Sequence, residues 1–233
     1  MSKNFWIALI AVVVGLFAVL KLTGGNGSVT KSNKYASGNV LDLKDEDHKS
    51  GVGNKKVTII EYGDFQCPSC GRFYSLVEQA RKEYGDDITF SFRHFPIPSI
   101  HKNAQAASRT AEAAAAQGKF FEMYSQLYET QDSWSESNSA QSIFEDFAQK
   151  LNLDMAKFKT DYASEATNSI IAADVESGKK AGVTGTPSIF INGKQIDNPA
   201  DYASFKKLID DAITAANPIT TAPAPAPTPA PSQ

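Results

Sequence analysis

The chain has 233 residues, of which 42% are hydrophobic and 21% charged, so the composition is that of a globular protein rather than a disordered one. A net charge of −3 excludes a large basic surface, and nucleic acid is therefore not an expected partner. Two cysteines are too few for a small scaffold held together by disulfides.

The chain begins with an apolar segment. Phe5 to Leu20 carries no charge, and Lys3 and Lys21 flank it. This length is at the short edge of what spans a bilayer as a helix; a cleaved signal peptide and a buried core helix are the alternatives. No small-residue cleavage site follows, which favours an uncleaved signal-anchor over residues 1–22. We therefore expect a single-pass protein of the cell membrane, with its remaining chain on the extracytoplasmic side, where disulfides persist.

Two polar segments border the central region. Residues 23–50 are rich in Gly, Ser and Asn, which predicts a flexible tether, although the alternation from Val40 to Leu43 allows an edge strand. Residues 217–233 hold six of the eleven prolines, alternating with alanine, which predicts a disordered, extended tail. A solvated tail without a specific partner and a stalk that spans a cell wall both fit this composition.

Residues 51–216 are expected to form one α/β domain. Runs rich in β-branched and aromatic residues predict strands, the last two joined by an Asn-Gly turn: Val57–Tyr62, Ile88–Phe92, Ser188–Ile191 and Lys194–Ile196. Helical spacing of apolar residues predicts helices over Cys70–Tyr84 and Asp201–Ala215. Between them, about 102–181 is helical almost throughout, with segments Ala104–Gln117, Phe120–Tyr128, Ile143–Leu151, Met155–Tyr162 and Ser164–Ala181.

Both cysteines lie where the first strand gives way to the first helix, in Cys67-Pro68-Ser69-Cys70. The unpaired amides and the dipole at a helix start stabilise a thiolate on Cys67, and Pro68 fits the first turn. Such a thiolate is both a nucleophile and a good leaving group, and Cys70 can resolve a mixed disulfide formed at Cys67. The spacing therefore favours redox chemistry.

Two other interpretations of the cysteine pair are a structural disulfide and half of a zinc site. A disulfide between residues so close in sequence adds little stability by loop closure. A zinc site normally needs two further ligands. The chain has no other cysteine, and its three histidines, His48, His94 and His101, show no paired spacing, so no metal is expected.

A second motif places a proline just before a strand, in Gly185-Thr186-Pro187-Ser188. With this motif the chain resembles the DsbA-like branch of the thioredoxin superfamily, which comprises extracytoplasmic thiol–disulfide oxidoreductases. The other segments that carry the resemblance are Val57–Tyr62, Asp64–Cys70, Phe92–Pro96 and Gly182–Pro187. It covers roughly residues 50–215 and implies a thioredoxin fold, with the helical block as an inserted helical subdomain.

The resemblance implies a role for each residue of the two motifs. Cys67 would be the surface nucleophile and Cys70 the buried resolving cysteine. Pro187 would be a cis-proline that faces the cysteine pair, and Thr186 would offer backbone groups to an extended substrate strand. Without the cysteines, Pro187 would be interpreted as a proline at the start of a strand.

Three further residues enter through the resemblance. Glu61 would be a buried acid beneath the cysteine pair, with a raised pKa that suits it to relay the proton of Cys70; the alternative is that Glu61 points sideways to a surface lysine. Pro68 and Ser69 would tune the redox potential. Ser69 stands where strongly oxidising members of the family often have histidine, and it adds no charge.

Residues near the motifs have two interpretations each. His94 at a strand end and His101 near a helix start are expected to be structural, the alternative being that they approach the cysteine pair from loops. A set of apolar residues would form either a peptide-binding rim or simple loop packing: Phe65, Phe95, Pro96, Ile97 and Pro98.

The function implied by the resemblance is that of a membrane-tethered oxidase that donates its Cys67–Cys70 disulfide to reduced or unfolded secreted proteins. It would need no cofactor besides this disulfide. A quinone-linked membrane partner of the DsbB or VKOR type would re-oxidise it. The alternatives are a reductase or isomerase of the same fold and a peptide-binding chaperone with an inert cysteine pair. No added dimerisation domain is visible in the sequence, so a monomer is expected.

Overall fold

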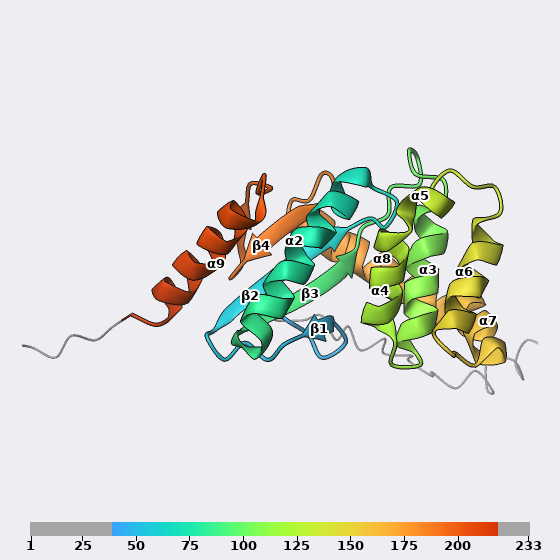
Figure 1. Ribbon diagram of the computed structural model, residues 1–233, viewed down its shortest axis with the longest axis horizontal. Coiled ribbons are helices and arrows are strands. Elements are labelled where there is room, and N and C mark those ends of the chain that lie inside the picture. The colour runs from blue at the N-terminus through green and yellow to red at the C-terminus, as the bar shows by residue number, and fades with distance from the viewer. Residues whose placement is uncertain (1–38, 219–233) are drawn as a thin grey trace, which may run out of the picture. The chain divides into compact units, whose positions relative to one another are not determined.

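The computed structural model describes residues 39–218, all within one compact unit (Figure 1). The expected anchor over residues 1–22 and nearly all of the Ala/Pro tail lie outside this range. Within residues 39–218, no helix is both long and apolar enough to cross a membrane.

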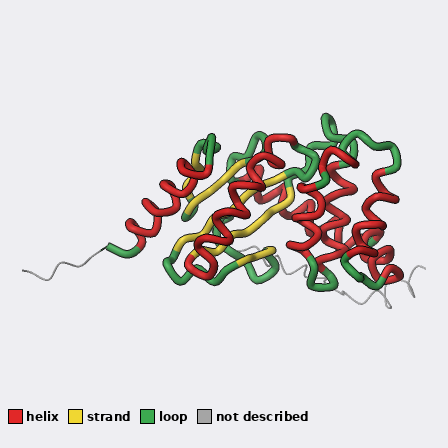
Figure 2. The backbone as a smooth tube through the Cα atoms, viewed as in Figure 1, coloured by secondary structure: helices red, strands yellow, loops and turns green. Residues whose placement is uncertain are grey.

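The core of the domain is a five-stranded sheet in the order β1-β3-β2-β4-β5. The inner strands β2 (Val57–Gly63) and β3 (Ile88–His94) run parallel, with Val57 opposite Ile88 and Gly63 opposite His94. The other strands are antiparallel to their neighbours: β1 (His48–Ser50) to β3, β4 (Ser188–Ile191) to β2, and β5 (Lys194–Ile196) to β4. Figure 2 shows the strands side by side, with a group of helices at one end.

The alternation along β2 divides the core between the two faces of the sheet. Val57 and Ile59 join the larger cluster of buried side chains, whereas Ile60 and Tyr62 join the smaller one. Glu61 has the same parity as Val57 and Ile59 and therefore points toward the larger cluster. Because β2 lies in the interior of the sheet, both of its faces are covered, and the strand is almost fully buried.

Helices cover both faces of the sheet. Helix α2 (Pro68–Tyr84), followed by the 3-10 turn η1 (Gly85–Asp87), and helix α9 (Tyr202–Ala216) belong to the larger cluster, where the rings of Phe73 and Phe205 meet at 5.2 Å. Asp201 begins α9 by accepting a hydrogen bond from the Ser204 main-chain nitrogen, which is the usual way to satisfy a helix start. Helix α8 (Glu165–Lys180) packs behind the sheet (Figure 1) and supplies Val175 to the smaller cluster.

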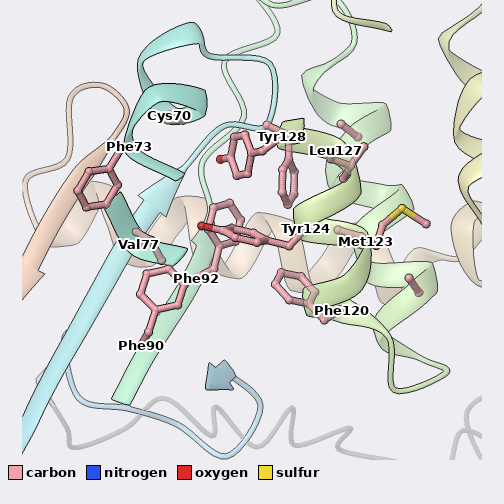
Figure 3. Packing of buried hydrophobic residues seen from close by; sticks show 14 of the residues in the cluster. Cys70, Phe73, Val77, Phe90, Phe92, Phe120, Met123, Tyr124, Leu127 and Tyr128 are labelled. Carbon is pink, nitrogen blue, oxygen red and sulfur yellow. The ribbon is translucent and has the colours of Figure 1, made fainter. Parts of the chain in front are cut away.

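The helical insertion predicted over about 102–181 is present between β3 and β4. Its helices are α3 (Ala104–Ala115), α4 (Phe120–Glu129), α5 (Gln131–Trp134), α6 (Ala140–Lys150), α7 (Met155–Ala163) and α8 (Glu165–Lys180). Helix α4 turns an aromatic face toward β3 and α2, and Tyr124 reaches from it toward the strands (Figure 3). The ring of Tyr124 lies 5.3 Å from that of Phe92. The insertion is therefore part of the same hydrophobic core as the sheet.

The prediction of a tether over residues 23–50 is wrong for its C-terminal part. From Asn39 the chain packs on the smaller cluster, and β1 lies where the tether was expected to end. The guanidinium of Arg93 holds this segment by bonding both carboxylate oxygens of Asp47, at 3.1 and 2.8 Å. A buried arginine needs these partners, which short-range sequence patterns do not reveal.

The edge strand considered at Val40–Leu43 is also wrong, because these residues form a turn. Arg93 donates hydrogen bonds to the carbonyl oxygens of Val40 and Asp42, at 2.6 and 2.8 Å, and so takes up groups that a strand would pair. The edge strand that the sheet does have is β1, which pairs His48 with Phe92.

Candidate active site

The cysteine pair lies at the start of α2. Cys67 is the residue just before the helix, with an extended backbone, and Pro68 occupies the first helical turn, where no amide hydrogen is needed. Both sulfurs are free thiols. The side chain of Cys67 is 7% exposed and that of Cys70 is 0% exposed, so Cys67 is the one that a partner reaches.

The two cysteines differ in acidity. A hydrogen bond from Cys70 is the largest cause that lowers the pKa of Cys67, to about 5; burial opposes it, and bonds from the Thr186 side chain and the amides of Cys70 and Ser69 add to it. Burial raises the pKa of Cys70 well above its ordinary value, and the hydrogen bond to Cys67 and the negative charge of Glu61 add to this effect. At neutral pH the reduced pair is therefore a thiolate at Cys67 beside a thiol at Cys70.

The loop before β4 meets the pair at Cys67. The Thr186–Pro187 peptide bond is cis, and the carbonyl oxygen of Thr186 lies 3.4 Å from Sγ of Cys67. Oγ1 of Thr186 is buried and has no hydrogen-bond partner among residues 39–218 other than the ionised sulfur of Cys67. This geometry agrees with the placement expected for Thr186 and Pro187 beside the cysteines.

Glu61 is fully buried in β2, on the face of the sheet beneath α2. Burial raises its pKa to about 8, a hydrogen bond from Tyr124 partly offsets this effect, and the charge of Cys67 raises it further. The Tyr124 hydroxyl donates to Oε2 at 3.5 Å, whereas Oε1 has no partner in the described part of the chain. Glu61 therefore does not point to a surface lysine, and at neutral pH it is a protonated acid near the pair.

The residues between the cysteines face the surface. Pro68 is exposed and Ser69 is half-buried. Arg72 donates a hydrogen bond of 2.8 Å to Oγ of Ser69 and thus holds a positive charge one turn beyond the pair. Ser69 adds no charge of its own, but its hydroxyl binds the charged side chain of Arg72.

Asp64 fixes the loop that leads into α2. Its Oδ1 accepts from the main-chain nitrogen of Gln66 at 2.8 Å. Its Oδ2 accepts from the main-chain nitrogen of Ile97 at 2.9 Å and lies 2.7 Å from Nδ1 of His101. His101 is thus part of the frame around the site, as a partner of Asp64. Asp64 stands within the cysteine motif of the sequence, but no role was predicted for it.

Gln131 of α5 is a second residue of this frame that the sequence did not reveal. Its Nε2 donates to the carbonyl oxygens of Phe65 and Cys67, at 2.6 and 3.1 Å. The short helix α5 was not predicted, and a single glutamine far along the chain carries no local signal. The helical insertion therefore holds the main chain of the cysteine motif directly.

The apolar residues beside the pair divide into two groups. Phe65, Phe95 and Pro96 are buried, which makes them loop packing rather than a rim. Ile97 is half-buried and Pro98 is exposed, and Ile100 beyond them is 70% exposed. A smaller apolar surface over residues 97–100 thus remains near Asp64.

The histidines show no paired spacing in the sequence, yet the tertiary structure brings two of them together. His48 and His94 come together on one carboxylate, that of Glu112, although all three residues are far apart in sequence. Because β1 pairs with β3, the edge strand brings His48 close to His94. This cluster shares no residue with the cysteine site.

The domain is similar in sequence and fold to known proteins. A family model described as thioredoxin matches residues 44–211. The structure of oxidised BdbD from Bacillus subtilis is 25% identical and has a TM-score of 0.64, over 72% of this chain and 93% of that one. That of α-DsbA1 from Wolbachia pipientis is 21% identical with a TM-score of 0.68, over 76% of this chain and 96% of that one.

One curated relative is named as an antiporter and not as an oxidoreductase. The Na(+)/H(+) antiporter NhaA 1 of Mycobacterium sp. (strain KMS) is 33% identical over 170 residues, which are 71% of this chain and 27% of that protein. The chain thus spans about a quarter of the length of this relative, and the antiporter activity is that protein's own. The family model covers most of the domain, including both cysteines and the cis-proline loop. The chain therefore belongs to the thioredoxin family.

Proposed function

We propose that the protein introduces disulfides into reduced or unfolded secreted proteins on the extracytoplasmic side of the membrane. The observation that carries the direction is the stabilised thiolate of Cys67, whose pKa is lowered to about 5. A protein that stabilises its reduced pair gives up its disulfide readily, because the reduction potential rises with the stability of the reduced form.

The proposed reaction begins with the disulfide between Cys67 and Cys70. A thiolate of the client attacks Sγ of Cys67, the bond to Cys70 breaks, and the electron pair goes to the sulfur of Cys70. A second client thiolate then attacks the client sulfur of the mixed disulfide and releases Cys67 as a thiolate. The client loses two electrons and two protons. One proton ends on Cys70 and the other goes to solvent, because Cys67 stays ionised.

Glu61 is proposed to supply the proton for Cys70. A buried thiol with a raised pKa is a poor leaving group unless it is protonated as it leaves. The carboxyl of Glu61, with a pKa of about 8, is protonated at neutral pH and lies on the face of the sheet beneath α2. The carboxylate that remains regains its proton from solvent. Glu61→Gln is expected to slow exchange at Cys70 without unfolding the protein.

Thr186 and Pro187 are proposed to bind an extended segment of the client. The main chain of Thr186 is next to the sulfur of Cys67, so a client strand that pairs there holds its cysteine close to Sγ. The apolar surface at Ile97, Pro98 and Ile100 offers contact to client side chains. Pro68 and Ser69 are proposed to tune the potential through the charge that Ser69 holds in place.

The location and the partner rest on the sequence alone. The apolar run from Phe5 to Leu20 supports a single-pass membrane anchor with the catalytic domain outside. We propose that a quinone-linked membrane protein of the DsbB or VKOR type accepts the electrons from the reduced pair. We also propose that the protein works as a monomer, which sedimentation of the full chain in detergent would test.

The decisive experiment is the equilibrium of the pair with glutathione, followed by oxidation of a reduced, unfolded secreted protein. An oxidase gives a potential of about −120 mV, well above that of thioredoxin, and restores disulfides in the client. A potential of about −270 mV would indicate a reductase instead. If the function is redox, Cys67→Ala abolishes all dithiol oxidation. If the wild-type cysteine pair is inert and the Cys67→Ala variant captures clients as the wild type does, the protein is a chaperone instead.

A further inference from the structure

A second cluster of reactive side chains lies between the sheet and the helical insertion. Nε2 of His48 in β1 is 2.5 Å from Oε1 of Glu112 in α3, and Nε2 of His94 in β3 is 2.7 Å from the same oxygen. The three donor atoms all lie within 4.8 Å of one another. From these positions we propose that His48, His94 and Glu112 bind one Zn²⁺ ion.

The donor atoms suit zinc. Two imidazole nitrogens and one carboxylate oxygen are ligands that zinc accepts, with a fourth position left for water or another group. Ligands held at about 2.0–2.1 Å by a tetrahedral ion stand roughly 3.3 Å apart. The two nitrogen–oxygen separations of 2.5 and 2.7 Å would therefore have to widen slightly to admit the ion. Calcium and magnesium prefer sets made of oxygen atoms alone, so the two imidazoles select against them.

The charges around the cluster also favour a cation. Arg93 is matched by Asp47. Glu112 forms ion pairs with the two histidines. Asp174 accepts a hydrogen bond of 3.0 Å from the main-chain nitrogen of His94 and so brings a second carboxylate to the site. The cluster thus contains one buried carboxylate and has a second carboxyl group close by, an arrangement that suits a divalent ion.

The surroundings hold the ligands in place. The side chain of His94 is fully buried and that of Glu112 is 3% exposed. The ring of Phe120 stacks on that of His48 at 3.6 Å, and the rings of Phe92 and Phe65 lie 5.4 and 5.9 Å from that of His94. An apolar shell of this kind limits water around a metal and orients its ligands. The ion would join the edge strand, an inner strand and the insertion.

The experiment uses the full chain in detergent, with any affinity tag removed, after treatment with a chelator. The protein is fully oxidised, so that Cys67 and Cys70 cannot bind zinc as thiolates. Competition against a chromophoric zinc indicator is expected to show one Zn²⁺ per chain. His48→Gln is the main variant because β1 is a short edge strand and the change conserves size. We expect it, and Glu112→Gln, to weaken zinc binding by more than about tenfold.

Two further measurements separate this site from others. Zinc is expected to raise the unfolding temperature of the oxidised wild type but not that of His48→Gln. Co²⁺ in place of zinc is expected to give visible d–d bands without the ultraviolet band of thiolate ligands. His101→Gln is the matched control, since this histidine pairs with Asp64, and it should bind zinc as the wild type does.

Clear outcomes would overturn the proposal. An oxidised chain that binds no zinc in competition with the indicator would remove the site. Binding that His48→Gln and Glu112→Gln leave unchanged would place zinc elsewhere. Tighter binding of Ca²⁺ than of Zn²⁺ at these residues would overturn the assignment of the metal. None of these results bears on the redox activity, which glutathione equilibrium measures separately.

Discussion

Sγ of Cys67 lies 3.4 Å from the main-chain oxygen of Thr186, although 119 positions separate the two residues. A neutral thiol donates to this oxygen, but a thiolate has no proton to donate. The hydroxyl of Thr186, which has no other partner among the described residues, then becomes the donor to the sulfur. The loop before β4 thus stabilises either protonation state of Cys67, by its backbone or by its side chain.

The first prediction concerns the acidity of Cys67. Ultraviolet absorbance of the thiolate in the reduced protein is expected to titrate with a pKa of about 5. Cys70→Ala removes the hydrogen bond that contributes most and should raise this pKa; Thr186→Val should raise it by less. If the sulfur titrates like a free thiol, the proposed oxidase mechanism loses its basis.

The second prediction concerns the stability of the two redox forms. Folding lowers the pKa of Cys67 from 9.0 to about 5, so the folded reduced chain binds fewer protons than the unfolded one between these values. The stability of the reduced form should therefore rise with pH from about 5 to 9 relative to the oxidised form, by about 1.4 kcal/mol for each pKa unit at most. Urea unfolding of both forms at several pH values measures it; a difference that does not vary with pH would contradict the prediction.

The third prediction concerns Glu61. Burial raises its pKa from 4.5 to about 8, so the folded chain keeps a proton that the unfolded chain loses as the pH rises through this range. The wild type therefore loses stability between these values, and Glu61→Gln removes the loss. The variant should be more stable than the wild type at pH 8, by a few kcal/mol at most, and the advantage should vanish toward pH 4. The exposed Glu46→Gln serves as the control.

The fourth prediction concerns Gln131. Gln131→Leu removes two hydrogen bonds to the main chain of the cysteine motif and leaves the carbonyl oxygens of Phe65 and Cys67 without this partner. The loss should cost about 1–3 kcal/mol of stability and shift the redox potential. Gln149→Leu, an exposed change on α6, is the control. Equal potentials for Gln131→Leu and the wild type would show that α5 does not position the pair.

The fifth prediction concerns the ion pair between Arg93 and Asp47. The side chain of Arg93 is 0% exposed and that of Asp47 3%, so Asp47→Ala leaves a buried charge without its partner. This should lower the free energy of unfolding by about 3–5 kcal/mol and expose residues 39–47 to proteases. Asp45→Ala, exposed in the same segment, should have little effect. A protease that cuts both variants alike would show that this segment is not held by Arg93.

Local patterns were sufficient to predict most of the fold. The predicted helix Met155–Tyr162 ends within one residue of α7, and the Asn192-Gly193 turn is present, with both residues at positive φ as such a turn requires. Strand β1 was not predicted because its three residues are held by pairing with β3, whose residues are distant in sequence.

The candidate site shows the same division between local and distant effects. Cys67, Cys70 and Pro187 stand in short motifs whose chemistry is local. The partners that tune them do not: Tyr124 and Gln131 come from the insertion and reach the site only through the tertiary fold. The cluster at Glu112 escaped for a related reason, since its histidines lie on neighbouring strands rather than at a fixed spacing in the chain.

The outer strands of the sheet, β1 and β5, have three residues each. An exposed strand is a template on which another polypeptide can add, and a short one offers few unpaired groups. Lys194 and Gln195 on β5 are exposed and polar, which further disfavours the addition of an apolar segment to that edge. If the protein binds reduced clients as proposed, these short borders would limit the addition of client segments to the sheet.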